Sequence, residues 1–325
     1  MTPLKLALLG TGRIADMRLA PALTQSRSAR LWSVLSRDPG RAADFAHRHD
    51  AGAPGPAHSD LEDLLADSEL DGVVIATPDG LHAAHALAAI RAGKHVLVEK
   101  PMATSGTDAA AMVAAAEAAD VRLGVAYHLR WHAGHRAMSD AVRAGAIGEP
   151  RHVRAQWAWP AEDDSNWRAH GEVGRWWSLA GVGTHCLDLI RWLMIPSCGE
   201  VEEVRGVASR SVWQGPHDET AVVALKFASG ATAQFTSSVQ FASPSQIHVY
   251  GSDGYFLGTD TLGPLGGGTI TSADGPLDFD VVNPFVGEID DFADAVREGR
   301  APEVDGAEGL RNVEILEEFS AVAGL

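Results

Sequence analysis

The stretch that decides the fold is residues 4–15, which read LKLALLGTGRIA. Its mostly apolar first half predicts a buried strand, and residues 16–23 continue as a predicted helix. Between them, Gly10, Gly12 and Ala15 have the G-x-G-x-x-A spacing of a dinucleotide-binding turn. Gly10 allows the tight turn, Gly12 lets a pyrophosphate approach the backbone, and Ala15 permits close packing of helix on strand. An incidental glycine turn is the alternative, but the flanking strand and helix are the context that the motif requires.

The end of the next strand, at residues 31–35, indicates which dinucleotide would bind. The side chain that binds the adenine ribose is expected at about this distance from the glycines. Ser36 and Arg37 stand there, and a small hydroxyl followed by a guanidinium suits a 2′-phosphate better than a bare 2′-hydroxyl. This favours NADP(H). Alternatively, Asp38 binds the ribose or Arg37 stacks on the adenine, and either arrangement would permit NAD(H).

Predicted strands and helices alternate through residues 4–126, which is typical of a doubly wound parallel sheet. Beyond the first two strands, we predict helices at residues 59–66, 83–92 and 104–119 and strands at residues 71–76, 96–101 and 121–126. We therefore predict an α/β fold whose N-terminal Rossmann domain occupies residues 1–124.

The strand at residues 96–101, VLVEKP, is a candidate for the chemistry. Pro101 removes a ladder donor and ends the strand, and ligands of open α/β sheets bind just beyond the carboxyl ends of the strands. A lysine there, Lys100, is a candidate for proton transfer, because its neighbours can lower its pKa toward neutrality. The alternative is that Glu99 and Lys100 form an ordinary exposed pair at a strand end.

After Tyr127 the pattern changes to longer alternating stretches separated by glycine-bearing turns. Strands are predicted at residues 151–159, 201–213, 220–227, 231–239 and 246–250, and helices at residues 137–145, 183–194, 284–298 and 307–323. Residues 263–268 read as a loop without a phosphate cradle, since no helix follows. We predict an α+β domain over residues 125–325, with a large and mostly antiparallel sheet that has helices on one face.

Composition narrows the class of protein. The 325 residues suit two domains, and the formal net charge of −17 disfavours nucleic acid and anionic membrane surfaces as partners. No apolar run approaches the ~18 residues of a membrane span, and we expect no signal peptide. The only cysteines, Cys186 and Cys198, lack metal-type spacing and fit a reducing cytoplasm. No metal site is expected, because His128 and His132 lack an identifiable third ligand.

Motifs that run nearly end to end along the chain match one known family. They are residues 10–15, 76–78, 82, 92–96, 99–101, 183–185, 188, 218–221, 283–285 and 309–313. On these residues the chain resembles the Gfo/Idh/MocA oxidoreductases, a family named after glucose–fructose oxidoreductase and inositol dehydrogenase.

The resemblance implies a nicotinamide-dependent dehydrogenase or reductase that acts on a sugar, polyol, cyclitol or related carbonyl. It implies that Lys100 contacts both substrate and cofactor as the acid/base and that His185 relays the proton, a role that suits its unperturbed pKa near 6.5. Asp188, one helical turn on, would orient His185, contact substrate or form a local ion pair. The expected cofactor site comprises Gly10, Gly12, Arg13, Ile14, Ser36, Arg37, Thr77, Pro78, His82, Glu99 and Lys100.

One position departs from the family pattern, in which an aspartate stands four residues before this histidine. Here that position is Gly181. Either another carboxylate takes over, with Asp163 or Asp164 as candidates, or Lys100 and His185 act alone. Alternatively, the chain is a sugar- or cofactor-sensing regulator that has lost catalysis. The enzyme is favoured because both Lys100 and His185 are present.

Tryptophans crowd the segment before this helix: Trp157, Trp159, Trp167, Trp176 and Trp177. Aromatic faces stack on sugar rings, so some could line a substrate pocket, although core packing is the commoner role of any one. On the resemblance, Trp167 and Arg168 contact substrate or cofactor. Arg130 follows the last strand of the first domain, where it could contact the cofactor or form a salt bridge that joins the two domains. A sheet with one open face also predicts a homodimer or homotetramer through the second domain.

Overall fold

A computed structural model describes residues 2–171 and 174–325. The described chain divides into two compact units, and each is treated by itself below. The first unit contains Met1–Tyr127 and Phe285–Val313, and the second contains His128–Pro284 and Glu314–Leu325. The units therefore do not follow a single cut after residue 124. The chain returns to the first unit near its end because Phe285–Val313 packs into that unit's core.

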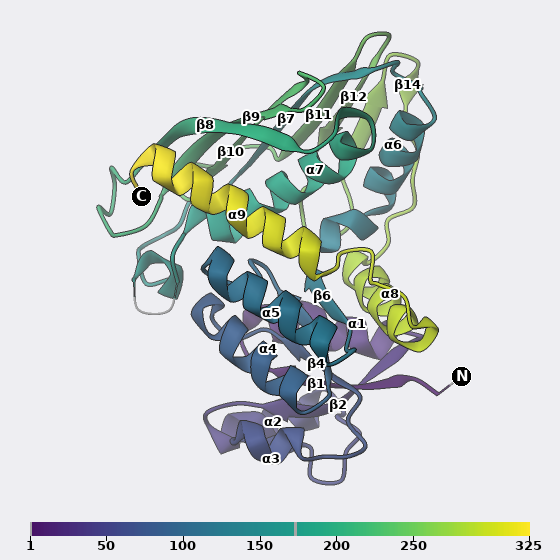
Figure 1. Ribbon diagram of the computed structural model, residues 1–325, viewed down its shortest axis with the longest axis vertical. Helices are drawn as coiled ribbons and strands as arrows, with labels where there is room; N and C mark the ends of the chain where they lie inside the picture. Colours follow the sequence, from purple (N-terminus) through teal and green to yellow (C-terminus); the bar gives the residue numbers. More distant parts are fainter. Residues whose placement is uncertain (1, 172–173) are drawn as a thin grey trace. The chain divides into compact units, whose positions relative to one another are not determined.

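The first unit is built on a parallel sheet in the order β3-β2-β1-β4-β5-β6 (Figure 1). Each neighbouring pair of strands is parallel. The strands are β1 (Leu4–Leu9), β2 (Ala29–Leu35), β3 (Ala57–His58), β4 (Gly72–Ile75), β5 (His95–Glu99) and β6 (Leu123–Ala126). The chain moves outward from β1 to β3 and then resumes on the other side of β1 with β4, so the predicted doubly wound α/β fold is confirmed.

Helices connect these strands and complete the unit. They are a π-helical turn η1 (Ala15–Leu19), α1 (Ala20–Gln25), α2 (Pro39–Arg48), α3 (Leu61–Leu65), η2 (Asp79–Leu81), α4 (His82–Arg91), α5 (Gly106–Ala118), α8 (Pro284–Glu298) and the first part of α9 (Gly306–Ala323). Helix α2 was not predicted, although its signals were in the sequence: Asp38 accepts the Arg41 N–H as a side-chain cap, and Pro39 stands in the first turn.

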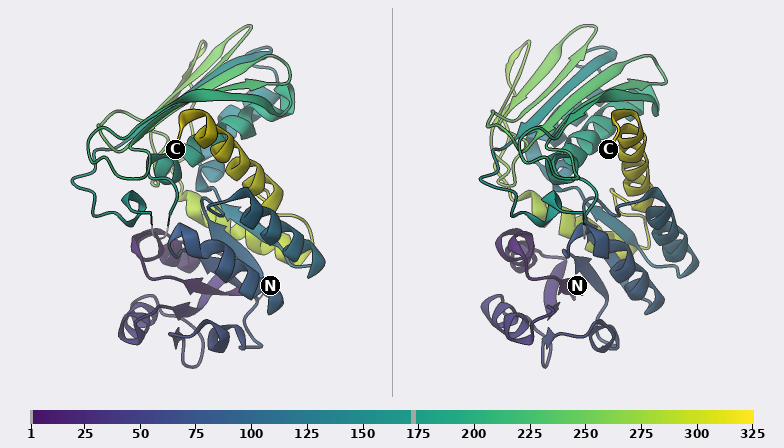
Figure 2. Two further views of the ribbon diagram at one scale, coloured as in Figure 1. Left: turned by 60° about the vertical axis from the view of Figure 1, so that its left-hand side comes forward. Right: turned by 90° about the vertical axis from the view of Figure 1, so that its left-hand side faces the viewer.

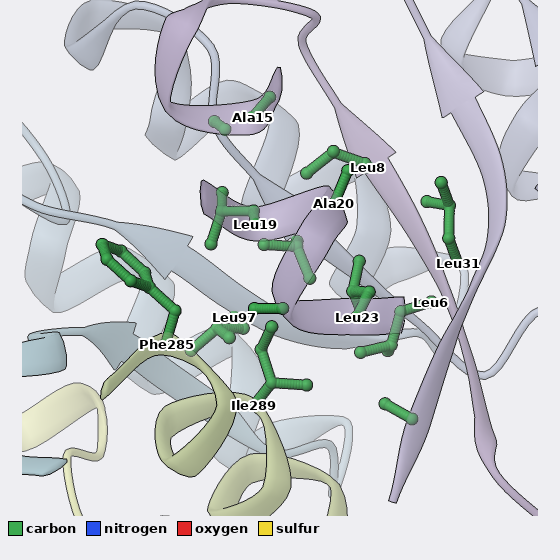
Figure 3. Close-up of a cluster of buried hydrophobic side chains, with 14 of the residues drawn as sticks. Leu6, Leu8, Ala15, Leu19, Ala20, Leu23, Leu31, Leu97, Phe285 and Ile289 are labelled. Atoms are coloured by element: carbon green, nitrogen blue, oxygen red, sulfur yellow. The ribbon is translucent and has the colours of Figure 1, made fainter. Parts of the chain in front are cut away.

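The core beside η1, α1 and α8 shows why the C-terminal segment belongs to this unit (Figure 3). Leu6 and Leu8 of β1 and Leu97 of β5 meet Phe285 and Ile289 of α8, and all five are at most 2% exposed. Burying a side chain of this size contributes about 1.5–3 kcal/mol. The apolar residues of α8 are therefore an integral part of the first unit's core.

The second unit contains a sheet in the order β14-β13-β12-β11-β7-β10-β9-β8 (Figures 1 and 2). The strands are β7 (Pro150–Ala158), β8 (Val201–Ser209), β9 (Thr220–Phe227), β10 (Thr232–Ser238), β11 (Gln246–Gly251), β12 (Tyr255–Thr259), β13 (Thr269–Ser272) and β14 (Gly275–Pro276). The pair β7–β10 is parallel and the other pairs are antiparallel, so the mostly antiparallel prediction is confirmed. Residues 263–268 lie in a loop, as predicted.

Burial alternates along β9, whose inward residues are buried and whose outward residues are mostly exposed. Helix α7 (Thr184–Cys198) packs against β7 and β10 on one face of the sheet (Figure 1). The unit also contains η3 (His128–Trp131), α6 (Ala133–Arg143), η4 (Trp167–Ala169), a π-helical turn η5 (Leu179–Gly183) and the end of α9.

The helical segment that contains His185 begins earlier than the prediction of residue 183. The turn η5 starts at Leu179 and continues directly into α7. Gly181 and Gly183 lower the local helix propensity, and this explains the late prediction. A distant carboxylate overrides that propensity, because Asp218 accepts hydrogen bonds from the Trp177 and Leu179 N–H groups at 2.9 Å and 2.8 Å.

Candidate active site

The turn after β1 has the geometry that the glycine pattern predicts. Gly10 has φ +104°, and a Cβ there would stand 2.6 Å from the carbonyl oxygen of Ala76 at the end of β4. The Gly10 N–H donates to the Leu35 carbonyl at the end of β2, so the turn is held between the two neighbouring strands. Only glycine fits this position without strain.

Gly12 stands at the exposed end of the same turn. Among the described residues, no atom lies within 4 Å of the place where its Cβ would be. Its carbonyl accepts the Asp16 N–H at 3.0 Å and starts the helical segment, with Arg13 exposed and Ile14 half-buried beside it. The backbone is therefore open to a phosphate at the point where N–H groups of a first helical turn are available.

The end of β2 contains the predicted cofactor-discriminating residues. Ser36 is 8% exposed, and its hydroxyl lies 3.3 Å from the Thr11 hydroxyl and 3.4 Å from the Asp38 N–H. Arg37 is exposed beside it. The Asp38 carboxylate accepts the Arg41 N–H at 2.8 Å, so one of its oxygens is engaged in capping α2.

The loops after β4 and β5 are joined through a buried histidine. His82 places Nε2 2.9 Å from the Thr77 carbonyl and Nδ1 2.8 Å from the Pro101 carbonyl. The Thr77 hydroxyl lies 3.1 Å from Nδ1 of His85, whose pKa is lowered by burial. A ring that meets one carbonyl from each loop fixes the spacing of the two loops at the carboxyl edge of the sheet.

Lys100 follows the last residue of β5 at that edge. Its backbone N–H lies 3.2 Å from Oε2 of the buried Glu99, and its side chain is half-buried. Strand β5 neighbours β4, and β4 neighbours β1. The carboxyl ends of parallel strands lie at one edge of a sheet, so Lys100 and the Gly10 turn share that edge with only β4 between their strands.

His185 lies in the second unit, near the start of α7, and is 3% exposed. Its ring lies 5.4 Å from the Trp157 ring, and the His128 ring meets it edge-on at 4.8 Å. Trp157 comes from β7 and His128 from η3, so two other elements pack against the histidine of α7. The predicted relay is therefore a packed and oriented side chain.

Asp188, one turn further along α7, forms an ion pair with Arg130. The guanidinium donates to both carboxylate oxygens, with Nε–Oδ2 at 2.9 Å and Nη2–Oδ1 at 2.6 Å. The two side chains are 3% and 1% exposed, so the pair is fully buried. The local bridge was one of the alternatives for Asp188. For Arg130 the expected salt bridge was one that joins the domains, whereas the observed pair lies within the second unit.

A buried carboxylate that the sequence analysis assigned no role orients the segment before His185. Asp218 accepts from the Ser178 hydroxyl at 2.6 Å in addition to the two backbone N–H groups already described. Burial raises the pKa of Asp218 above its ordinary value. The sequence signal was the acidic pair Asp218-Glu219 directly before the apolar residues of β9, because carboxylates beside a buried strand need hydrogen-bond donors from elsewhere in the fold.

The indole of Trp159 fills the space beside Gly181, the position at which the family pattern has an aspartate. A Cβ on Gly181 would stand 2.6 Å from Cη2 of Trp159. The candidate substitutes Asp163 and Asp164 are both exposed, and Asp163 caps the Ser165 N–H. The structure does not bring either carboxylate to Gly181 through any described contact.

The other predicted aromatic residues separate into two groups. Trp176 and Trp177 are buried, and Trp176 donates to the Ser320 hydroxyl at 2.7 Å, so these two pack in the interior. Trp167 is half-buried in η4, and the guanidinium carbon of Arg168 lies 4.3 Å from its ring centroid. Trp167 and Arg168 thus form one cation–π unit on the segment before α7.

Comparison with known proteins agrees with this geometry. Residues 4–127 match the family described as "Oxidoreductase family, NAD-binding Rossmann fold", and residues 135–257 match the "GFO/IDH/MocA C-terminal domain". The chain belongs to the Gfo/Idh/MocA family. The resemblance seen in the sequence is confirmed, and the protein is an NAD(P)-dependent oxidoreductase of that family.

Relatives of this Gfo/Idh/MocA chain act on carbohydrates, as their names state. A 1,5-anhydro-D-fructose reductase of Ensifer adhaerens is 30% identical over 93% of this chain and 91% of its own length. A D-xylose 1-dehydrogenase [NADP(+)] of Haloarcula marismortui is 26% identical over 96% and 88%. The crystal structure of an aldose-aldose oxidoreductase from Caulobacter crescentus, complexed with glycerol, is 26% identical with a TM-score of 0.90, covering 99% of this chain and 98% of that one.

Among the described residues, no group of three or more histidine, cysteine, aspartate or glutamate side chains is placed to hold a metal ion. No helix in the described part of the chain is both long and apolar enough to cross a membrane.

Proposed function

We propose that this protein catalyses reversible oxidation of a secondary or anomeric hydroxyl of a sugar, polyol, cyclitol or related carbonyl compound, with Lys100 as the main acid/base and His185 as the proton relay. The observation that carries the proposal is the position of Lys100. It is a half-buried amine at the same sheet edge as the Gly10 turn, and only β4 separates the two strands. Relatives named as sugar reductases and dehydrogenases support the substrate class.

The residues present fit a nicotinamide dinucleotide. The tight turn at Gly10 and the open backbone at Gly12 suit a pyrophosphate, which would lie against the start of η1. When bound, the nicotinamide supplies the hydride chemistry. Lys100 then holds or accepts the proton of the reacting oxygen, and His185 passes that proton onward. Thr77, Pro78, His82 and Glu99 set the edge at which the ring would lie.

NADP(H) is the favoured cofactor, with NAD(H) as the second choice. The buried Ser36 hydroxyl and the exposed Arg37 guanidinium stand at the end of β2, where a 2′-phosphate would be bound. One Asp38 oxygen already caps α2, which weakens the alternative of a ribose-binding aspartate. A relative named for NADP(+) agrees with this preference.

Trp167 and Arg168 are retained as proposed substrate contacts, because a guanidinium stacked on an indole presents a donor surface that suits hydroxyl-rich ligands. Asp188 is instead proposed to act through its pair with Arg130, by holding α7 in place.

The test is a screen of aldoses, polyols and inositols with both cofactors, following the absorbance of the reduced nicotinamide. Lys100→Met should lower kcat by about 10²–10⁴-fold, the usual contribution of general acid–base catalysis. The matched control is Lys5→Met, because Lys5 lies at the opposite end of the same sheet and pairs with Glu69 on the surface. Turnover that survives unchanged in Lys100→Met would contradict the assignment.

A regulatory protein of the same fold is the second candidate, and Gly181 is the observation that favours it. Without a carboxylate at this position, the site loses one electrostatic partner for a lysine. Cofactor binding without turnover of any compound in the screen, by wild type and Lys100→Met alike, would favour the regulator.

We also propose a homodimer or homotetramer that forms through the outer face of the second unit's sheet. Val207 of β8 and Val222 of β9 are paired across the strands and are 67% and 39% exposed. An apolar pair on an open face suits a protein interface. Sedimentation as a monomer at working concentration would contradict the assembly.

The buried free cysteines, Cys186 and Cys198, suit a reducing cytoplasm.

A further inference from the structure

Two tryptophans at the end of β7 are matched in spacing to two positions of the helical segment η5–α7. Trp157 lies against His185, and Trp159 lies against Gly181. Two residues along a strand span roughly 6.7 Å, and four residues along a helix rise about 6 Å. The strand and the helical segment therefore contact each other at two successive positions, with one indole at each.

The indole of Trp159, and not a backbone requirement, explains why residue 181 is a glycine. Gly181 lies within the π-helical turn η5, where its conformation is open to any residue and alanine would be favoured over glycine. A Cβ there would stand 2.6 Å from Cη2 and 3.3 Å from Cζ3 of Trp159. Carbon atoms in contact lie about 3.5–4.0 Å apart, so a side chain at position 181 and the present indole exclude each other.

Both the backbone and the side chain of Trp159 are held in place. The backbone N–H of Trp159 donates to the Ser238 carbonyl at 3.1 Å, which extends the β7–β10 pairing beyond the strand. Trp159 also packs against a small buried cluster of Ala169, Trp177 and Val239. Both Trp159 and Gly181 remain partly exposed. Trp159 is thus held by the fold while the residue stays partly exposed, beside a glycine one helical turn before His185.

The exposed part of an indole offers an apolar, electron-rich face and no acceptor. Such a face stacks on the C–H surface of a closed sugar ring. An open-chain polyol has no rigid C–H face to present, and a carboxylate that could bind its hydroxyls is excluded at position 181. We propose that Trp159, seated on Gly181, is a specificity-determining residue that selects ring-closed carbohydrates over open-chain polyols and aldehydes. This inference rests on the proposed function, because it assigns the substrate class of the site at His185.

The first experiment measures binding and needs no turnover. Saturation-transfer NMR on the full chain with NADP(H) compares methyl β-D-glucopyranoside with sorbitol. Wild type should bind the glycoside more tightly. Trp159→Ala should weaken glycoside binding about 10-fold, the equivalent of a stacking contribution of about 1.4 kcal/mol, while sorbitol binding is unchanged. Trp159→Phe should fall between the two, and Trp213→Phe, in a tryptophan that packs against the same cluster, should match wild type.

A second experiment tests the exclusion directly. Gly181→Ala should lower the thermal midpoint and weaken glycoside binding, because the new Cβ displaces the indole. The same change in a Trp159→Ala background should leave the midpoint unchanged or raise it, because the clash is gone and alanine favours the helix. Equal losses in both backgrounds would overturn the proposed packing.

The outcomes separate this inference from the proposed function. Equal loss of glycoside and sorbitol in Trp159→Ala, no change in either, or a wild type that binds neither or prefers sorbitol would each overturn the specificity role. If wild type binds glycosides selectively and Trp159→Ala abolishes the selectivity, the inference holds even if no sugar is oxidised, and only the catalytic proposal fails. If sugars are oxidised but selectivity is untouched by Trp159→Ala, only the inference fails.

Discussion

The Arg130–Asp188 ion pair gives the sharpest test of how α7 is held. The guanidinium donates to both carboxylate oxygens, and the two side chains are 3% and 1% exposed. Removing one partner leaves the other charge buried without this counter-ion, which costs about 3–5 kcal/mol. Replacing both by apolar residues removes both desolvation penalties and is often close to neutral. We expect Asp188→Leu and Arg130→Met each to destabilise by that amount, and the double variant to lose far less than their sum.

The expected loss is large against a typical unfolding free energy of about 5–15 kcal/mol. It corresponds to a fall in the thermal midpoint of roughly 6–20 °C for a unit of this size. The assay is urea unfolding followed by tryptophan emission. Of the nine tryptophans, only Trp32 belongs to the first unit, so the emission reports the unfolding of the second unit, where the pair lies.

Two results would refute this reasoning. Single variants that each cost less than about 1 kcal/mol would mean that the pair behaves like an exposed one. Strictly additive costs would mean that the two charges are not coupled. Kinetics then distinguish a positioning role of Asp188 from a direct contact with substrate. A double variant that regains stability and keeps its KM shows that Asp188 acts through Arg130. One that regains stability while KM rises shows that the carboxylate contacts substrate.

Three further predictions follow from the two units. Gly10→Ala places a Cβ 2.6 Å from the Ala76 carbonyl at a φ of +104°, so dinucleotide affinity measured by calorimetry should fall at least 10-fold, with a strain cost of about 1–3 kcal/mol; unchanged affinity would exclude this turn as the binding site. Arg37→Gln should lower the preference for NADP(H) over NAD(H) about 10-fold or more, because one charge-assisted bond to a 2′-phosphate is lost, and an unaltered ratio would favour the stacking alternative. Burial lowers the pKa of His135 from 6.5 to about 3, so the unfolded chain binds a proton that the folded chain does not, and stability should fall by about 1.4 kcal/mol per pH unit below pH 6.5. In His135→Leu the free energy of unfolding, measured between pH 6.5 and 5, should depend less steeply on pH, by the slope that corresponds to about one bound proton. An identical slope would exclude His135 as its source.

The first unit could be predicted closely from the sequence because its signals are local. The glycine turn, the buried strand β5 and the side-chain caps of α3 and α5 depend on neighbours within a few residues, so they can be recognised in the sequence itself. Helix α2 was missed although its cap, Asp38, is local as well. The other feature missed there is not local. The return of Phe285 and Ile289 to the core beside β1 depends on contacts across more than 250 positions, which no local pattern records.

In the second unit, the start of the helical segment that contains His185 could not be predicted from the local sequence. Local propensity favours a start near Gly183, because Gly181 and Gly183 both disfavour helix. The actual start at Leu179 depends on Asp218, which lies on the chain after α7 and supplies the acceptors for the Trp177 and Leu179 N–H groups. A capping residue that is distant in sequence satisfies the same donors as an adjacent one, but it leaves no local signature.

At position 181 a functional interpretation also depends on contacts that the local sequence does not record. In the sequence it is a missing carboxylate, and a comparison of motifs can conclude only that a group was lost. In the structure the same position is the seat of Trp159, which the extension of β7 and the cluster around Trp177 hold in place. A loss of catalysis would leave no reason for glycine to remain in a helical turn that disfavours it. The Trp159 indole does give such a reason, because it needs the space beside residue 181. We therefore interpret Gly181 as part of an altered binding surface.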